Sequence, residues 1–587
     1  YTQEIPDYRN RALSPEKRAA DLLKRMTLEE KLGQLRNSFP SKDMAIPSGG
    51  LGGITTMIID GTCANPAEGL AKTANVLQRK VIAASRFGIP AIIHDEALHG
   101  FGREGATSFP HSIALAAMWD SDLMERVSAA IAKETRAAGC RQALAPVVNI
   151  GNDPRWGRTQ ETYGEDPYLS SRYGAAYCKA FTKEGVVTTP KHFVANFGDG
   201  GRDSNPVHFS ERILREIYFP PFEACIKEGG ALSLMPAFNS LDGRPCNANR
   251  WLLTDILRTE WGLKGFTVCD YDALHEIMVF HRTAANMKEA AAQALNAGLD
   301  VEVPGIRVYG QPLMDAVKEG LVKESAIDEA VRRRLEVKFG LGLFENPFAP
   351  ENADAYKAYN SPEHHALALD AARESIVLLK NDRNTLPFGP GLKGLAVIGA
   401  KADVAQLGNY SRPGDGRVSI LQGIRQIAPK TARIVFERGT DHVEYRLPLI
   451  PAEYFTHIEN GKSVPGLRTE FFNNMDLKGA PVLVRSEPRI DMNIGGRPDP
   501  AVNDDSFSFR YTGRLRAPMT GKVTLSISSG DGVRFFFEGR KLLESWEDRF
   551  CTTDYCTVNL VKGREYDFVM EVQEDKWETK AFLGWDY

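Results

Sequence analysis

Residues 265–271, Gly-Phe-Thr-Val-Cys-Asp-Tyr, form a short apolar run that ends in a carboxylate, Asp270. The same pattern, an apolar run closed by a polar residue and followed by an amphipathic stretch, repeats from residue 51 to residue 303. Such a repeat predicts βα units around a parallel sheet. The seven runs are 53–60, 90–95, 143–150, 186–190, 231–237, 265–269 and 298–303. Roughly 250 residues of these units favour a (β/α)8-type TIM barrel, with a doubly wound sheet as the alternative that periodicity does not exclude.

Helix signals flank this repeat on both sides. Ser14-Pro15 and the capping box Thr27–Glu30 predict the starts of two helices before it. A further helix is expected over residues 325–339, where Gly340 supplies the stop signal. The barrel domain is therefore expected to occupy residues 1–350.

A second α/β domain is expected to follow. Residues 342–350 contain the Gly, Asn and Pro typical of a linker. Residues 351–463 then begin like a sandwich domain, with a helix at 362–374 and strand-like runs at 375–379 and 394–399. The α/β pattern stops before such a sheet would be complete, so we expect only the first part of an α/β sandwich here.

The pattern changes again at residue 464. From there to residue 587 hydrophobicity alternates with period two, as in the runs 522–527 and 533–537. Alternation in several short runs predicts an all-β module.

Composition excludes several classes of function. The chain has 587 residues, 43% of them apolar and 25% charged, which is typical of globular proteins and not of disordered or fibrous ones. Lys plus Arg (72) nearly balance Asp plus Glu (76), and the net charge of −4 argues against a nucleic-acid partner. No stretch approaches the ~20 apolar residues that a membrane helix needs. A partial dinucleotide-loop pattern at 397–400 is better explained as a turn, and we expect no cofactor.

The polar residues that follow the apolar runs are candidates for a functional site, because the carboxyl ends of barrel strands surround the active site. Five successive runs deliver such residues, more than the ordinary polarity of strand ends explains. They are His94, Asp95 and Glu96; Asp153 and Arg158; Lys191 and His192; Asn239; and Asp270.

This set of side chains suits a hydroxyl-rich substrate. Sugar hydroxyls donate to carboxylates and accept from Arg, Lys or His, while one carboxylate can attack the anomeric carbon. A metal site around His94, Asp95, Glu96 and His99 is the alternative, but the HExxH spacing is missing, so we expect no metal. A hydrolase acting on sugars is the favoured prediction.

Five segments occur in an order and spacing that resemble a known family, the family 3 glycoside hydrolases, which are exo-acting β-glycosidases. The segments are 96–100, 153–167, 191–193, 210–218 and 265–271. Residues 375–387 are similar to the opening of the family's α/β-sandwich domain, and the resemblance covers roughly residues 15–440. The resemblance implies a β-glucosidase or β-xylosidase type of enzyme.

The all-β tail resembles the PA14 domain through residues 467–472 and 529–539. Some family 3 enzymes carry this domain inserted in the sandwich domain, where it projects toward the substrate entrance. That resemblance implies a PA14-like domain over residues 464–587 and explains why the sandwich is interrupted.

The family resemblance assigns roles to residues of this chain. Asp270 would be the nucleophile of a retaining exo-β-glycosidase that releases a terminal sugar through a covalent intermediate. The ring hydroxyls would be held by Glu96, Arg158, Lys191 and His192, and Tyr271 would offer a stacking face beside the nucleophile.

Two departures from the family pattern affect this assignment. Phe238 stands where relatives usually have a Tyr whose hydroxyl contacts the nucleophile, and Tyr271 stands where Trp is commoner. The family's general acid/base is normally a Glu of the sandwich domain beyond the PA14 insertion, so we expect it beyond Tyr587. Two alternatives stay open: a carbohydrate-binding protein with an inactive or incomplete hydrolase site, and a glycoside phosphorylase or transglycosidase.

Specificity and location are predicted less directly. A β-glucoside is expected first and a β-xyloside second, since Glu96 is longer than the Asp of many relatives and would crowd an exocyclic carbon. The partner is a small carbohydrate, and homo-oligomerisation stays open. By family resemblance the protein is expected to be secreted or periplasmic, and the first residue, Tyr1, suggests that an upstream segment was removed. A disulfide between Cys551 and Cys556 also stays open.

Overall fold

The computed structural model describes residues 5–39, 46–47, 49–56, 66–303, 307–351, 353–411, 417–439, 447–495, 498–503, 506–547, 552–574 and 578–587. Cys551 lies outside these residues, so the pairing considered for Cys556 is not tested. None of the helices in the described part of the chain is long and apolar enough to cross a membrane.

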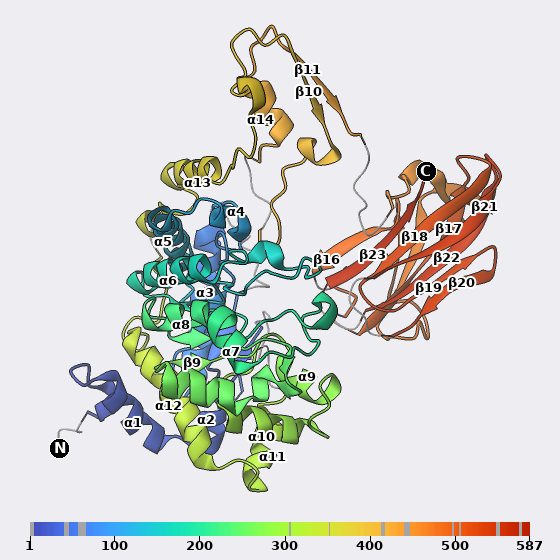
Figure 1. Cartoon of the computed structure of the whole chain (residues 1–587). Helices are drawn as coiled ribbons and strands as arrows, with labels where there is room; N and C mark the ends of the chain where they lie inside the picture. The colour runs from blue at the N-terminus through green and yellow to red at the C-terminus, as the bar shows by residue number, and fades with distance from the viewer. Residues whose placement is uncertain are drawn as a thin grey trace. The chain divides into compact units, whose positions relative to one another are not determined.

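The first part of the chain contains a parallel sheet, as predicted (Figure 1). Its strands pair in chain order, and a separate parallel pair follows them. The strands are β1 (Asn37–Ser38), β2 (Gly53–Thr55), β3 (Ile92–Asp95), β4 (Gln142–Ala143), β5 (Val187–Thr188), β6 (Ser233–Leu234) and β9 (Phe266–Thr267). A short antiparallel hairpin joins β7 (Ser240–Leu241) to β8 (Arg244–Pro245).

Single parallel bridges connect these pieces. Phe193 pairs with Pro236, Val268 with Val301, and Glu302 with Arg36. The pairing therefore returns to the segment where it began, next to β1. The run 298–303 contributes bridges instead of a regular strand, and β1 was not predicted because its two residues, Asn and Ser, are polar.

Helices follow or precede these strands, and local sequence explains several of their ends. Thr27 and Glu30 form the predicted capping box at the start of α2. Asp120, Asp166 and Asn286 accept hydrogen bonds from first-turn amides of α5, α6 and α10. The helices are α1 (Pro15–Arg25), α2 (Leu28–Gln34), α3 (Pro66–Ala84), α4 (Ser112–Ala116), α5 (Ser121–Ala137), α6 (Pro167–Lys183), α7 (Glu211–Ile213), α8 (Pro220–Lys227), α9 (Ala273–Val279), α10 (Met287–Ala297), α11 (Gln311–Lys318) and α12 (Glu324–Gly340), with π-helical turns at Leu214–Tyr218 and Trp251–Glu260.

Helix α13 (Pro362–Glu374) forms where it was predicted and is tied to α5 by a buried carboxylate. Glu134 of α5 has no solvent exposure and accepts hydrogen bonds from four donors. Two come from Thr107, at 2.9 and 2.7 Å, and the others from the Asn360 amide at 3.0 Å and His364 Nδ1 at 2.7 Å. A buried charge needs this many partners to be tolerated.

Beyond α13 the chain forms two paired strands, β10 (Gly394–Ile398) and β11 (Arg433–Glu437), and one helix, α14 (Ile420–Ile427). The predicted strand at 375–379 is wrong: these residues are irregular, and Leu379 is 91% exposed. A strand needs a hydrogen-bonded neighbour, and no neighbour within the described residues pairs with this segment. Ile420 and Ile427 of α14 are also exposed.

The tail is antiparallel throughout its described strands, which confirms the predicted β module. One sheet has the order β13-β12-β17-β22-β19-β20, with β14 also paired to β17 and β15 paired to β14, and the other has the order β16-β23-β18-β21. The strands are β12 (Phe455–Glu459), β13 (Lys462–Pro465), β14 (Leu467–Phe472), β15 (Leu483–Glu487), β16 (Asp491–Gly495), β17 (Phe507–Arg516), β18 (Gly521–Ser529), β19 (Val533–Phe537), β20 (Arg540–Ser545), β21 (Thr552–Leu560), β22 (Glu565–Glu574) and β23 (Glu578–Trp585).

Alternation explains how the two sheets of the tail share a core. In β14, Leu467, Thr469 and Phe471 are buried, while Arg468 between them is exposed. Side chains of both sheets, such as Phe509 of β17 and Leu525 of β18, belong to one buried apolar cluster. Period-two patterning thus buries one face of each sheet.

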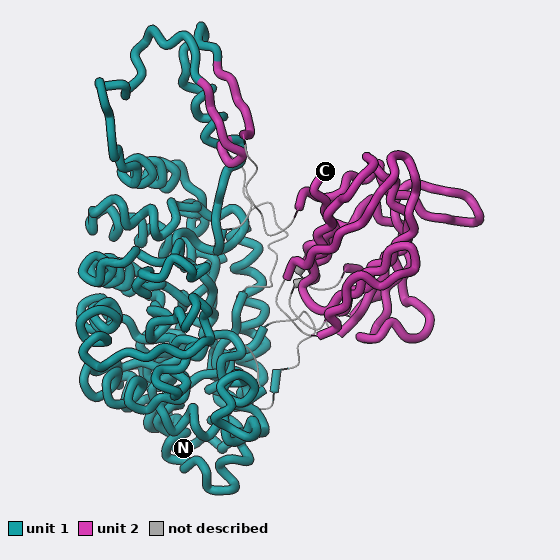
Figure 2. Tube along the Cα trace, turned by 45° about the vertical axis from the view of Figure 1, so that its right-hand side comes forward, with its two compact units in different colours: residues 1–395, 403–433 teal, residues 396–402, 434–587 magenta. Residues whose placement is uncertain are grey.

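The chain divides into two compact units (Figure 2). One unit comprises residues 1–395 and 403–433, and the other comprises residues 396–402 and 434–587. The three-domain division at residues 350 and 463 stays a prediction.

Candidate active site

Asp270 lies just past the end of β9, at the carboxyl edge of the parallel strands. Its Oδ1 accepts a hydrogen bond from the Tyr271 amide at 2.8 Å. Its Oδ2 is buried and accepts no hydrogen bond from the described residues, although His192 Nε2 lies 3.3 Å away. Burial raises the pKa of Asp270, and the nearby Arg158 and Lys191 cations oppose that rise. The carboxylate therefore presents one oxygen without a donor to the interior of the site.

His192 follows β5, and its hydrogen bonds define its proton position. Asn149 uses its Nδ2 to donate to the carbonyls of His192 and Ala195, so its Oδ1 is the acceptor facing His192 Nδ1 at 3.1 Å. Nδ1 thus carries the proton, and Nε2 accepts from Arg158 at 3.0 Å. Burial, with Arg158 and Lys191 nearby, lowers the pKa of His192 well below its ordinary value. The imidazole is neutral, and the contact with Asp270 is not an ion pair.

One neighbour of His192 requires a choice of amide orientation. Asn196 Nδ2 lies 3.1 Å from His192 Nδ1, which already donates to Asn149, while the Oδ1 of Asn196 is buried without a partner among the described residues. Rotating this amide by half a turn would present Oδ1 to the Nδ1 proton, which would then be shared between Asn149 and Asn196.

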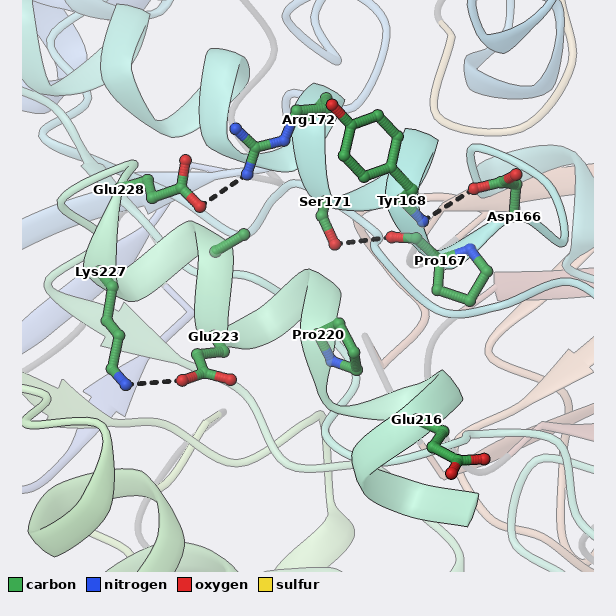
Figure 3. Close-up of a pocket in the computed structure, with 11 residues that line it drawn as sticks. Asp166, Pro167, Tyr168, Ser171, Arg172, Glu216, Pro220, Glu223, Lys227 and Glu228 are labelled. Atoms are coloured by element: carbon green, nitrogen blue, oxygen red, sulfur yellow. Dashed lines mark hydrogen bonds and ion pairs between the residues drawn. The ribbon is translucent and has the colours of Figure 1, made fainter. Parts of the chain in front are cut away.

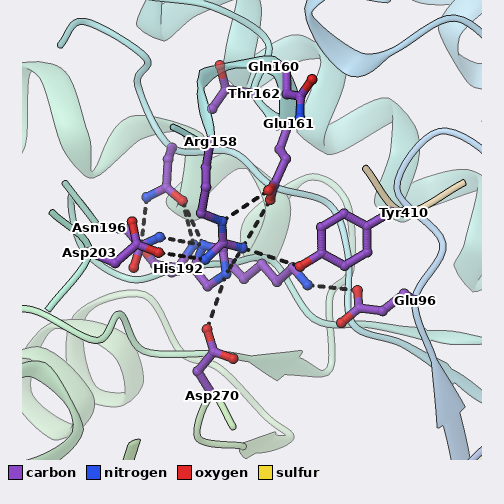
Figure 4. Close-up of polar contacts among 12 residues, drawn as sticks. Glu96, Arg158, Gln160, Glu161, Thr162, His192, Asn196, Asp203, Asp270 and Tyr410 are labelled. Atoms are coloured by element: carbon purple, nitrogen blue, oxygen red, sulfur yellow. Dashed lines mark hydrogen bonds and ion pairs between the residues drawn. The ribbon is translucent and has the colours of Figure 1, made fainter. Parts of the chain in front are cut away.

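Arg158 is fixed by two carboxylates. Its Nε and one terminal nitrogen donate to the two oxygens of Glu161, each at 3.0 Å, and its other terminal nitrogen donates to Asp203 at 2.9 Å. Asp203 also accepts from Trp156 Nε1 at 2.5 Å. This forked geometry leaves the guanidinium little freedom and aims it at His192 and Asp270 (Figure 4).

Glu96 and Lys191 form a buried ion pair on the other side of the site. Lys191 Nζ donates to Glu96 Oε2 at 2.7 Å, and both side chains are at most 5% exposed. Burial raises the pKa of Glu96 to about 7, although Lys191 favours the charged form. The carboxylate of Glu96 still has lone pairs that can accept from a sugar hydroxyl. The ammonium of Lys191 still has protons that it can donate to one.

Tyr410 also reaches this cluster, from a segment that lies beyond the predicted barrel (Figure 4). Its hydroxyl lies 3.4 Å from Arg158, and the centre of its ring lies 5.2 Å from Lys191 Nζ. Both distances are at the long end for a hydrogen bond and for a cation–π contact.

The structure brings together five of the six side chains that the sequence predicted for the site. Glu96 contacts Lys191, Arg158 contacts His192, and His192 approaches Asp270. The sixth, Tyr271, follows Asp270 directly, and its ring stacks on Phe39 with centroids 5.8 Å apart.

Other residues at strand ends have structural partners instead. Asp95 binds Arg103 at 2.6 Å, Asp153 binds Arg155 at 2.7 Å, and Asn239 Oδ1 accepts from the Asn196 amide at 3.0 Å. Within the described residues, no group of three or more His, Cys, Asp or Glu side chains could hold a metal ion.

Sequence reasoning missed Glu161, Asp203 and Tyr410 as members of the site. Glu161 lies inside a recognised segment, 153–167, yet no role was assigned to it. Its spacing of three from Arg158 could have suggested the forked ion pair. Asp203 and Tyr410 lie in loops far from any strand end, where no periodicity marks them. The Gly408-Asn409 dipeptide was a turn signal without a functional meaning of its own.

A concave feature lies apart from these residues, between α6 and α8, with a volume of about 560 Å³ (Figure 3). Four of its charged groups pair with one another: Arg172 with Glu228 at 2.6 Å, and Lys227 with Glu223 at 2.6 Å. Asp166 caps α6 there. The groove is lined by residues of α6, α8 and the turns before them and by none of the strand ends, although Arg172 Nε is buried there without a partner among the described residues.

Comparison with known proteins supports the predicted family. Residues 27–337 match the glycosyl hydrolase family 3 N-terminal domain, which is more than half of the chain. The chain belongs to glycosyl hydrolase family 3. Residues 463–587 match the PA14 domain. The family 3 chain therefore combines a mixed α/β domain with a parallel sheet and an antiparallel PA14 region, as the sequence indicated.

Two curated relatives and one solved structure illustrate the similarity. A periplasmic β-glucosidase of Salmonella typhimurium is 36% identical over 74% of this chain and 57% of its own length. A β-xylosidase of Formosa agariphila is 36% identical over 61% of this chain and 54% of its own length. The β-glucosidase EmGH1 of Erythrobacter marinus superimposes with a TM-score of 0.70 at 25% identity, over 97% of this chain and 95% of that one. The chain thus spans just over half the length of these curated relatives.

Proposed function

We propose that this family 3 chain acts as a retaining exo-β-glycosidase that releases a terminal sugar from oligosaccharides or glycosides. The observation that carries the proposal is the Asp270 carboxylate, which presents an oxygen without a donor beside Arg158, His192 and Lys191. Asp270 would attack the anomeric carbon, the aglycone oxygen would leave with a proton, and water would later cleave the glycosyl ester.

The surrounding residues would bind the sugar. Arg158 and Lys191 would donate to ring hydroxyls, and Glu96 would accept from one. The lone pair of His192 Nε2 would accept from another once the sugar displaces its contact with Arg158. Burial raises the pKa of Asp270, and the two cations oppose that rise, which favours the ionised form that a nucleophile requires. Tyr271 orients Asp270 through its backbone amide.

A retaining mechanism needs a second carboxyl about 5–5.5 Å from the nucleophile as acid/base. We assign this role to none of the described carboxylates and expect it on a further segment of the family's sandwich domain. Aryl glycosides are suitable first substrates, because a good leaving group needs little protonation.

β-Glucosides are the proposed first substrates and β-xylosides the second. Among the relatives, one β-glucosidase and one β-xylosidase match with the same identity, 36%. The ratio of kcat/KM for aryl xyloside over aryl glucoside decides the order, and a ratio well above one reverses it.

The decisive experiment is trapping of the covalent intermediate. An activated 2-fluoro aryl glycoside should raise the mass of the intact protein by one sugar, and Asp270→Asn should abolish both the adduct and turnover, by several orders of magnitude. Asp122→Asn, at an exposed position on α5, is the matched control. An Asp270→Asn variant with full activity would disprove the assignment.

The same experiment separates the alternatives. Binding of a terminal sugar without any adduct or turnover would indicate a carbohydrate-binding protein, which Phe238 in place of the family's Tyr makes worth testing. Release of a sugar phosphate only when phosphate is present would indicate a phosphorylase.

The finer features of fold and location belong to the same proposal. The parallel pairings that return to Arg36 support an eight-unit (β/α) barrel, with a partial sandwich domain at 351–463. One curated relative is periplasmic, which supports a secreted or periplasmic location.

A further inference from the structure

The loop Leu407–Ser411 carries Tyr410 into the site from beyond the barrel. Gly408 and Tyr410 both have positive φ, 77° and 59°, so the backbone turns sharply on both sides of Asn409. A left-handed conformation is unfavourable for tyrosine and persists only where the surroundings hold it in place. The loop must therefore be anchored on either side of Tyr410.

His99 and His111 provide the anchor. Their rings stack with centroids 4.2 Å apart, and His99 Nδ1 lies 3.0 Å from the Phe109 carbonyl. On the loop side, His99 Nε2 lies 2.9 Å from the Asn409 carbonyl and 3.4 Å from Ser411 Oγ. The residues that flank Tyr410 are thus both in contact with one imidazole.

No residue other than glycine fits at position 408 of this loop. A Cβ added at Gly408 would lie 1.4 Å from His111 Nε2, closer than any two non-bonded atoms can approach. Only glycine permits this approach as well as the positive φ. The absence of a side chain at Gly408 therefore allows the loop to pack directly against His111, next to His99.

The side chain of Tyr410 ends between the two cations that the proposed function assigns to sugar binding. Its oxygen accepts weakly from Arg158, and its ring lies beside Lys191. Its hydroxyl proton has no acceptor among the described residues. Burial, with Glu96 nearby, raises the pKa of Tyr410 well above its ordinary value, so the phenol keeps this proton. Tyr410 is partly buried, so its O–H is a donor that an oxygen of a ligand can still engage.

We propose that Tyr410 is a substrate-binding residue whose hydroxyl donates to an oxygen of the terminal sugar, and that His99 is the positioning residue that holds its loop. The proposal rests on the proposed function, because it takes the surroundings of Asp270 as the sugar site. Tyr410 adds a donor next to Glu96, which accepts, so one hydroxyl of the sugar can be satisfied in both directions. The contact is present in bound substrate as well as in the transition state, so it lowers KM more than it raises kcat.

The first test removes only the hydroxyl. Tyr410→Phe should raise KM for an aryl glycoside about tenfold with little change in kcat. Tyr359→Phe is the matched control, because Tyr359 donates to the Glu104 carbonyl in the same unit, away from Asp270. Unchanged KM in Tyr410→Phe would overturn the proposal.

The second test concerns His99. His99→Ala should raise KM by a similar factor in the wild type but add little in the Tyr410→Phe background, since His99 acts through Tyr410. His99→Gln, whose amide can still donate to the Asn409 carbonyl, should recover part of the loss. Fully multiplicative losses in the double variant would show that His99 acts independently and refute its positioning role.

A binding measurement keeps these tests separate from the proposed function. Calorimetric titration of the Asp270→Asn variant with glucose or xylose should give about tenfold weaker binding when Tyr410→Phe is added. Loss of binding without any turnover by the wild type would support Tyr410 and refute the hydrolase. Turnover by the wild type, together with unchanged binding in the Asp270→Asn/Tyr410→Phe variant, would support the hydrolase and refute the role of Tyr410.

Discussion

Ion pairs of glutamate with Lys or Arg occur in both units of this chain, but they differ in exposure. In the PA14 region a row of alternating charges crosses the strands β14, β17, β22, β19 and β20, where the side chains are 11–42% exposed. It consists of Glu470, Arg510, Glu571, Arg534 and Glu544, with contacts from 2.8 to 3.8 Å. Around Asp270, pairs such as Glu96–Lys191 are at most 5% exposed.

The comparison shows that burial, more than pairing itself, determines how much a charged side chain affects stability and local geometry. Exposed pairs exchange water for each other at little net gain. Buried pairs lose hydration that their mutual attraction hardly repays, so removing one partner leaves the other uncompensated. The buried set therefore holds a geometry, while the more exposed row mainly keeps its strands in register.

The largest expected effect comes from breaking the buried pair. Lys191→Met leaves the Glu96 carboxylate without its cation and should lower the free energy of unfolding by about 3–5 kcal/mol. Turnover of an aryl glycoside should fall by more than about a hundredfold, because a donor to the sugar is lost. Urea unfolding and initial rates measure the two effects.

The double variant Lys191→Met/Glu96→Gln sharpens this result. It should regain most of the stability, because no buried charge remains, but none of the activity. Equal stability of the single and double variants would contradict the account.

A pH dependence of stability follows from Glu302. Burial raises the pKa of Glu302 from its ordinary 4.5 to about 7, although the amides of Val308 and Tyr309 favour the charged form. Its stabilising contribution is present in full below pH 4.5 and is lost as pH rises through about 7. The free energy of unfolding should fall by on the order of 3 kcal/mol across this window from this group alone.

Glu302→Gln should flatten that slope while lowering stability by a pH-independent amount, since its amide nitrogen would face a backbone N–H. The exposed Glu544 is the control, because hydrogen bonds from Lys541 and Arg534 lower its pKa. Glu544→Gln should leave the slope between pH 5 and 8 as it is. A wild-type slope that persists in Glu302→Gln would refute the role of this carboxyl.

A smaller effect is expected for Arg158→Lys. An ammonium cannot reproduce the two parallel bonds to Glu161 or the contact to Asp203 at the same time. We expect kcat/KM to fall about a hundredfold with a melting temperature within a few degrees of the wild type. A fall of less than threefold would show that charge alone is sufficient there.

The smallest effect is expected in the exposed row. Arg534→Met removes contacts to Glu544 and Glu571 but keeps much of the packing on Trp546, whose ring centre lies 3.9 Å from the guanidinium. The free energy of unfolding should change by less than about 1 kcal/mol, and turnover of an aryl glycoside should not change. A loss of about 3 kcal/mol, as large as that expected for the buried pair, would remove the distinction between the two regions.

The sequence predicted those parts of the fold that local pattern controls. The capping box at Thr27, helix α13 and the alternation of the β module follow from side chains within a few residues of each other. Strand β1 could not be predicted because Asn37 and Ser38 are polar and their pairing with Gly53 and Ile54 is made by the backbone. Residues 375–379 have the composition of a strand, but a strand also requires a neighbour that local sequence does not reveal.

Some residues of the candidate site could likewise be predicted from local sequence, and others could not. Glu96, Lys191 and Asp270 could be predicted because strand carboxyl ends converge in any parallel βα fold. Tyr410 could not, since its place depends on how a loop packs on His99 and His111. Contacts between segments distant in sequence carry no periodic signal.

The carboxylate of Glu134 bears on where this polypeptide can be divided. A fragment ending at residue 350 would lose Asn360 and His364, two of the donors that Glu134 needs at a position with no solvent exposure. A protein engineer seeking the smallest stable piece should therefore cut after α13, at residue 375 or later, and a protease acting on the folded chain should spare the stretch before it.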